Sequence, residues 1–95
     1  MNAAELVMLE ELTDKLIPHV RKLAAGASSN GKVQRKFLAF SLSLLLAYVA
    51  QDFKMVSDIS GKLCSIDGPA GRAVIGKIVD LLNGDENKEE EIRWN

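Results

Sequence analysis

The segment from Phe37 to Ala50 constrains the fold more than any other feature of this sequence, because it is apolar on almost every side. Some of its apolar residues form one helical stripe. Most other sides of the helix are also apolar, because they carry Leu38, Leu42, Leu45, Leu46 and Val49. A helix that is apolar nearly all round has to be buried nearly all round. The run includes two serines and is shorter than the roughly 20 residues that a membrane span requires. It therefore predicts a buried helix over about residues 32–51.

The first part of the chain predicts a second long helix, from Ala3 to Ala25. Apolar residues recur there at alternating steps of three and four, with Thr13 in one apolar place: Leu6, Leu9, Leu16, Val20 and Leu23. Pro18 lies inside this pattern, so we expect a kink near it. The stretch from Gly26 to Gly31 should end this helix and cap the next one. The two helices are then expected to form an antiparallel hairpin.

Two shorter helices are expected after the hairpin. Ile59, Leu63 and Ile66 indicate the first, and the second is indicated by Val74, Ile75, Ile78, Val79 and Leu82. Asp67, Gly68 and Pro69 are typical of a cap followed by a first-turn proline, and Asn83 with Gly84 is typical of a helix end.

Two glycines interrupt the last of these helices. Gly71 and Gly76 each cost up to about 1 kcal/mol relative to alanine inside a helix. We therefore expect a close approach between neighbouring helices at both positions.

The composition agrees with a helical bundle. The hydrophobic fraction is 47% with only 5% aromatic residues, so the core must be built from leucine, isoleucine, valine and alanine. After Gly84 the chain is rich in acids and has almost nothing to bury. The sequence predicts an all-α protein, a small bundle of about four helices in residues 1–84 with an acidic, flexible tail in residues 85–95.

Basic residues gather on either side of the expected hairpin turn. The cluster consists of Arg21, Lys22, Lys32, Arg35 and Lys36, within a stretch from Lys15 to Gln51 that contains no acid. Folding the hairpin should bring these cations to one end, where they are a candidate site for an anion, an acidic protein surface or nucleic acid. The alternative is ordinary solvation, although cations at a helix N-terminus oppose the helix dipole.

The turn itself matches the first seven positions of a phosphate-binding loop, from Gly26 to Lys32. Val33 then occupies the place where Ser or Thr would hold magnesium, and a helix precedes the motif where a strand is required. A helix-to-helix turn is the better interpretation. Exposed amides at the start of the second helix remain a candidate for anion binding without a sheet.

The leucine-rich helix offers more apolar surface than the two short helices are expected to cover. Copies of the chain should then associate through it, and the candidate residues are Leu38, Leu42, Leu45, Leu46 and Val49. A dimer is the first expectation. A second chain running antiparallel would bring the acidic groups at the chain start and in the tail against the basic cluster.

No catalytic, cofactor-binding or metal-binding residues are predicted. The single Cys64 and the single His19 cannot supply the three or four protein ligands of a zinc site. Cys64 lies on a short apolar helix and is interpreted as a packing residue, and His19 lacks a partner nucleophile. With no leader-like N-terminus, the cytoplasm is the expected compartment.

These observations favour a non-enzymatic helical interaction module, such as a small regulator, an adaptor or a phage or plasmid accessory protein. It would act by self-association and by binding another protein, with no cofactor and no membrane contact. The alternative is a binder of an anion, a nucleotide or nucleic acid that uses the basic end of the hairpin.

Overall fold

The computed structural model describes residues 1–84 of the chain, which form four α-helices and, within that range, no strand. The helices are α1 (Ala3–Ala27), α2 (Gly31–Val49), α3 (Phe53–Ile66) and α4 (Gly68–Asn83). The predicted all-α bundle with a long first hairpin and two shorter helices is confirmed. The predicted acidic tail lies outside the described residues.

Each helix begins at an asparagine or aspartate that caps it. The side chains of Asn2, Asn30, Asp52 and Asp67 accept hydrogen bonds from backbone amides of the first turns. Asn2 and Glu5 complete a reciprocal capping box, in which the Asn2 amide donates to the Glu5 carboxylate at 3.2 Å. These local contacts fix where the helices start, so the boundaries follow closely from the sequence.

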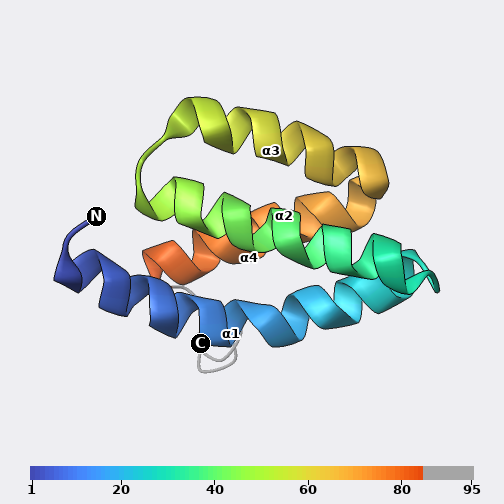
Figure 1. The fold of residues 1–95 in the computed structure, drawn as a ribbon, viewed down its shortest axis with the longest axis horizontal. Helices are drawn as coiled ribbons and strands as arrows, with labels where there is room; N and C mark the ends of the chain where they lie inside the picture. Colours follow the sequence, from blue (N-terminus) through green and yellow to red (C-terminus); the bar gives the residue numbers. More distant parts are fainter. Residues whose placement is uncertain (85–95) are drawn as a thin grey trace, which may run out of the picture.

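Two residues in the left-handed region end helices. Gly84 follows α4 at φ 74°, which confirms the predicted stop, because glycine has no Cβ to clash there. Gln51 adopts φ 57° between α2 and α3. This tight connection turns the chain back, so α3 runs antiparallel to α2 (Figure 1).

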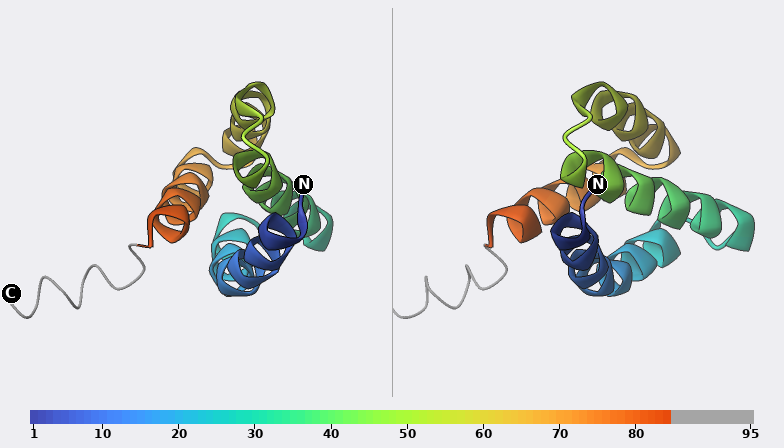
Figure 2. Two further views of the ribbon diagram at one scale, coloured as in Figure 1. Left: turned by 90° about the vertical axis from the view of Figure 1, so that its left-hand side faces the viewer. Right: turned by 60° about the vertical axis from the view of Figure 1, so that its left-hand side comes forward.

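The four helices pack as a ring in which each contacts the next and α4 closes back onto α1. Figure 1 shows α1, α2 and α3 in a row with α4 behind, and the end-on view of Figure 2 shows α4 beside α1 and α3. α1 is continuous and bends in its middle, where Pro18 lies (Figure 1), as the proline predicts. α1 also begins beyond the ends of α2 and α4 (Figure 1).

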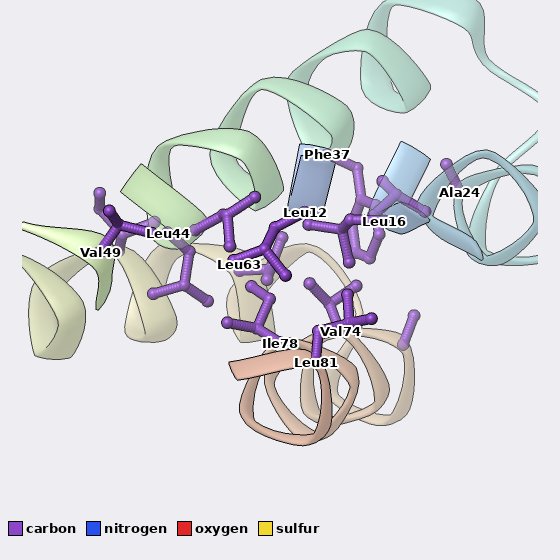
Figure 3. Packing of buried hydrophobic residues seen from close by; sticks show 14 residues of the cluster. Leu12, Leu16, Ala24, Phe37, Leu44, Val49, Leu63, Val74, Ile78 and Leu81 are labelled. Carbon is purple, nitrogen blue, oxygen red and sulfur yellow. The ribbon is translucent and has the colours of Figure 1, made fainter. Parts of the chain in front are cut away.

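The core lies along the axis of this ring. Side chains from all four helices point toward one another in Figure 3, among them Leu16, Phe37, Leu63 and Ile78, which are fully buried. Ser41 is the buried polar residue of α2, and its hydroxyl donates to the Phe37 carbonyl at 2.8 Å. That bond satisfies the hydroxyl, so the serine fits an otherwise apolar helix.

The buried face of α1 differs from the predicted stripe. Buried residues follow a four-residue step through Leu12, Leu16, Val20 and Ala24, whereas Leu6 is 51% exposed. The prediction was wrong at the start of the helix because α1 begins beyond the ends of α2 and α4, so fewer neighbours cover its first turn (Figure 1).

The expected apolar excess of α2 is largely covered by the chain itself. Phe37, Leu44, Leu45 and Val49 are all buried against the other helices. Leu46 is the large apolar side chain of α2 that stays exposed. The expectation that the bundle would be too small to cover this helix was therefore wrong, because α1, α3 and α4 surround it.

Candidate binding surfaces

The up-and-down topology divides the charged side chains between the two ends of the bundle. The basic end comprises the second half of α1, the first half of α2, the second half of α3 and the first half of α4. Its cations are Arg21, Lys22, Lys32, Arg35, Lys36, Lys62 and Arg72. Asp67 is the acid of this end among the described residues, and its carboxylate is used as the cap of α4.

The opposite end combines acids with exposed apolar side chains, and we call it the apolar end. Its charged side chains within residues 1–84 are seven acids, Glu5, Glu10, Glu11, Asp14, Asp52, Asp58 and Asp80, and two lysines, Lys54 and Lys77. The bundle is therefore electrically polarised along its length, which is a stronger pattern than the cluster at the hairpin turn alone.

The five predicted basic residues reach the same end but are divided among separate surfaces. Arg21 and Arg35 line one pocket between α1 and α2. Lys22 faces the start of α4, beside Asp67 and Pro69. Lys36 lies on the α3 side with Lys62, and its ammonium is 5.8 Å from the centre of the Phe40 ring. Lys32 is exposed in the first turn of α2.

The pocket between α1 and α2 has a volume of about 330 Å³. Arg21 and Arg35 form its charged part, Gln34 and Gly31 lie beside them, and Ala24 and Leu38 supply apolar wall. Within residues 1–84, neither arginine makes an ion pair. Within residues 1–84, two arginines and no carboxylate thus line one concave surface, and guanidinium groups suit a phosphate or carboxylate ligand.

The position of the Arg35 guanidinium follows from its helical spacing to Gly31. A Cβ added at Gly31 would lie 3.4 Å from the Arg35 Nη1, so the arginine folds back over the first residue of α2. Arg72 repeats this geometry on α4, where its Nη1 would be 3.2 Å from a Cβ at Gly68. Arg72, however, does not line the pocket that Arg21 and Arg35 share.

The phosphate-loop resemblance at residues 26–32 is a helix-to-helix turn, as its context predicted. The Asn30 side chain accepts hydrogen bonds from the amides of Lys32 at 2.9 Å and Val33 at 3.4 Å. Those amides are already satisfied. The charged side chains, more than these two capped amides, are therefore the groups that a ligand would meet.

The predicted self-association residues are split between the core and the surface. Leu45 and Val49 are buried within their own chain, and Leu38 and Leu42 are half-buried against the core. Leu46 is 40% exposed and is the most accessible of the five residues to a partner. A single exposed face through all five residues therefore does not exist on the folded chain.

The structure instead gathers exposed apolar side chains at the apolar end. The large hydrophobic residues that are exposed within residues 1–84 are Met1, Leu6, Val7, Met8, Leu46, Phe53, Met55 and Val79. They come from the start of α1, the end of α2, the start of α3 and the second half of α4. Figures 1 and 2 both place the N-terminus beside the end of α2.

One signal in the sequence does point to this surface. Leu6, Val7, Met8 and Leu9 are consecutive, and four successive helical positions span roughly 300° of the helix circumference. They cannot all face one neighbour. Phe53 and Met55 carry no comparable signal, because their exposure depends on how α3 is rotated in the bundle.

His19 and Cys64 do not line the pocket that Arg21 and Arg35 share. The His19 side chain is exposed overall. The pKa of its imidazole is nevertheless lowered below the ordinary value, first by the part of the ring that is buried and then by the positive charges of Lys77 and Lys22. Cys64 is half-buried against Gly71 of α4, which agrees with a packing role. Within the described part of the chain, no group of three His, Cys, Asp or Glu side chains is arranged to hold a metal ion.

Comparison with known protein families, with characterised proteins and with solved structures gives no match for this chain. Across residues 1–84, every helix falls short of the length or the hydropathy that crossing a membrane requires.

Proposed function

We propose that this protein is a non-enzymatic helical interaction module that binds other protein chains through its apolar end, beginning with a second copy of itself. The observation that carries the proposal is the location of its exposed large hydrophobic side chains, which all lie in that half of the described bundle. Exposed apolar groups scattered singly need no explanation, whereas their collection at one end is typical of an interaction surface.

The residue types at this end suit a binding surface. All 3 methionines of the chain and Phe53, which is 66% exposed, belong to it. Phenylalanine and methionine are enriched at the centres of protein interfaces, and flexible methionine side chains adapt to a partner. Burying one such side chain contributes about 1.5–3 kcal/mol, so a few of them support a stable complex.

The protruding start of α1 adds a geometric argument. Val7 is 56% exposed and lies on the side of α1 opposite Leu16, so no other part of residues 1–84 covers it. Two copies related by a two-fold axis would each bury this segment against the other's apolar end.

Salt dependence separates this arrangement from the acid-to-base pairing expected from the sequence. Acids such as Glu10, Glu11 and Asp52 accompany the apolar end, so two such ends repel each other at low ionic strength. Association through the apolar ends should strengthen as salt is added. Pairing of an acidic end with a basic end should weaken.

Solution mass tests the proposal. We expect the wild-type chain to form a dimer whose population rises with protein concentration and with salt, as measured by sedimentation velocity. The double substitution Val7→Glu and Phe53→Glu should give a folded monomer, because both positions are exposed. Ala73→Glu, which adds one acid at an exposed site of α4 outside the apolar end, is the control and should leave the dimer intact.

Two results would contradict the proposal. One is a wild-type chain that stays monomeric at all salt and protein concentrations. The other is a dimer that the double substitution leaves unchanged while its helicity by circular dichroism is retained.

A further inference from the structure

We infer that the pocket between the end of α1 and the start of α2 is a binding site for a phosphate monoester of a small molecule, held by Arg21 and Arg35. The site lies at the opposite end of the bundle from the proposed protein interface. It goes beyond that function and does not depend on it.

Two basic side chains from different helices converge on this pocket. Arg21 and Arg35 are separated by the hairpin turn in sequence, yet both line the same pocket. Two guanidinium groups repel each other, and neither forms an ion pair with residues 1–84. Two like charges on one concave surface disfavour each other, and a dianionic phosphate bound there would attract both.

The surroundings of this pair carry further positive charge. Lys32 is exposed nearby in the first turn of α2, and the acid of this end, Asp67, faces Lys22 on the far side of α1. Arg35 is also folded back over Gly31, so its charge lies at the start of α2, where the helix dipole is positive. The charges of Lys32 and Arg35 and the positive end of the α2 dipole therefore all favour an anion in this pocket.

The size and the wall of the pocket suit a small molecule. At about 330 Å³ it is larger than a phosphate group and falls at the lower end of the range for small-molecule sites. Ala24 and Leu38 line it with apolar surface, which can cover the body of a ligand while the arginines hold its phosphate. A nucleic-acid strand would instead follow the cations over the whole basic end, without preference for this pair.

Titration with named probes tests this inference. Inorganic phosphate and adenosine monophosphate are titrated into the full chain at about 20 mM and about 300 mM NaCl, with binding followed by amide chemical shifts and by calorimetry. We expect saturable binding of both, tighter for the nucleotide, with the largest shifts at residues 21–38. Arg21→Gln and Arg35→Gln should each weaken binding about tenfold or more, because each removes charged hydrogen bonds to the phosphate.

Arg72→Gln is the matched control. Arg72 has the same charge, lies at the same end and folds back over the first glycine of its own helix, but it does not share the pocket. It should change the affinity less than about twofold, the difference expected from one distant screened charge. The Val7→Glu and Phe53→Glu double variant should bind phosphate like the wild type, so failure of the proposed interface and failure of this site remain distinguishable.

Three outcomes would overturn the inference. They are the absence of saturable binding of either probe at low salt, equal losses in Arg21→Gln, Arg35→Gln and Arg72→Gln, and binding of a short DNA duplex with no binding of the two small probes. Circular dichroism of each variant shows whether the fold is retained. Arg21→Lys and Arg35→Lys should each keep more affinity than the corresponding Gln variant, because they keep the positive charge.

Discussion

The backbone of Gly71 in α4 lies directly against Cys64 in α3. A Cβ added at Gly71 would come within 2.8 Å of the Cys64 Sγ and within 2.9 Å of the Cys64 Cα. Because one of those atoms belongs to the backbone, a change of side-chain rotamer cannot relieve the contact. The α3–α4 pair is therefore held at a distance that only glycine allows.

Gly71→Ala should destabilise the bundle by about 1–3 kcal/mol, the usual cost of overpacking. Adding Cys64→Ala should not restore stability, because the contacts with the backbone Cα and N of residue 64 remain. Urea unfolding of both variants measures this. Full rescue by Cys64→Ala would show that the Cys64 sulfur, and not the close approach of the α3 backbone, causes the loss of stability in Gly71→Ala.

Gly76→Ala is predicted to have the opposite effect. A Cβ there would meet nothing within 4 Å, and the residue is exposed on α4. Alanine should then stabilise the helix by up to about 1 kcal/mol. A lower unfolding midpoint for this variant would contradict the open space seen at Gly76.

Asp67→Ala should cost about 1 kcal/mol, because it removes the cap of α4. The lost bond is the one that the Ala70 amide donates to the Asp67 carboxylate at 2.9 Å. Asp67→Asn keeps an acceptor oxygen in the same place and should retain most of the stability. Equal losses in the two variants, measured by thermal unfolding, would mean that the negative charge matters more than the cap.

Leu16→Ala should destabilise the protein by about 2–5 kcal/mol, since it removes a fully buried core side chain and leaves a cavity. Leu6→Ala makes the same chemical change in the same helix at a position that is 51% exposed, and its effect should stay below about 1 kcal/mol. Chemical denaturation at a protein concentration that favours the monomer compares the two. Similar losses would contradict the buried face described for α1.

The stability of the fold should decrease as the pH falls below about 6.5, partly because of His19. Its pKa is lowered in the folded state by burial and by the positive charges of Lys77 and Lys22. The unfolded chain therefore takes up the proton first, and the loss continues until the pH passes the lowered folded pKa. His19→Gln should show a smaller difference in unfolding free energy between about pH 7.5 and about pH 5 than the wild type.

Nuclear magnetic resonance titration of the His19 ring gives the same test directly. The wild-type pKa should lie below the ordinary value, and Lys77→Gln should raise it, since that change removes a nearby positive charge. A pKa that does not respond to Lys77→Gln would remove the electrostatic part of this explanation.

The helix boundaries were predictable because the signals that set them are local. Asp67 and Gly84 act through contacts within their own turns, and such contacts are visible as residue types at fixed spacing. The close approach at Gly71 was predicted correctly, whereas the same expectation for Gly76 was wrong. A glycine in a helix has the same local cost in both places, and only the position of α3 distinguishes them.

The candidate sites were less predictable because they depend on how the helices are rotated and where they end. The hairpin brings Arg21 and Arg35 to one end by topology alone, but the sequence does not show that these two share a pocket while Lys22 and Lys36 face other helices. Likewise, helical periodicity placed Leu6 on the same stripe as Leu16. Helical periodicity carries no information about where the neighbouring helices end. Leu6 is exposed because α1 begins beyond the ends of α2 and α4 (Figure 1).

The excess of cations at one end of residues 1–84 and of carboxylates at the other gives this part of the chain a permanent electric moment. A field from a charged surface would rotate such a body before it made contact. On an anionic support the chain should adsorb with Arg21 and Arg35 toward the support and with Val7 and Phe53 toward the solution. Immobilisation would then present every copy in one orientation.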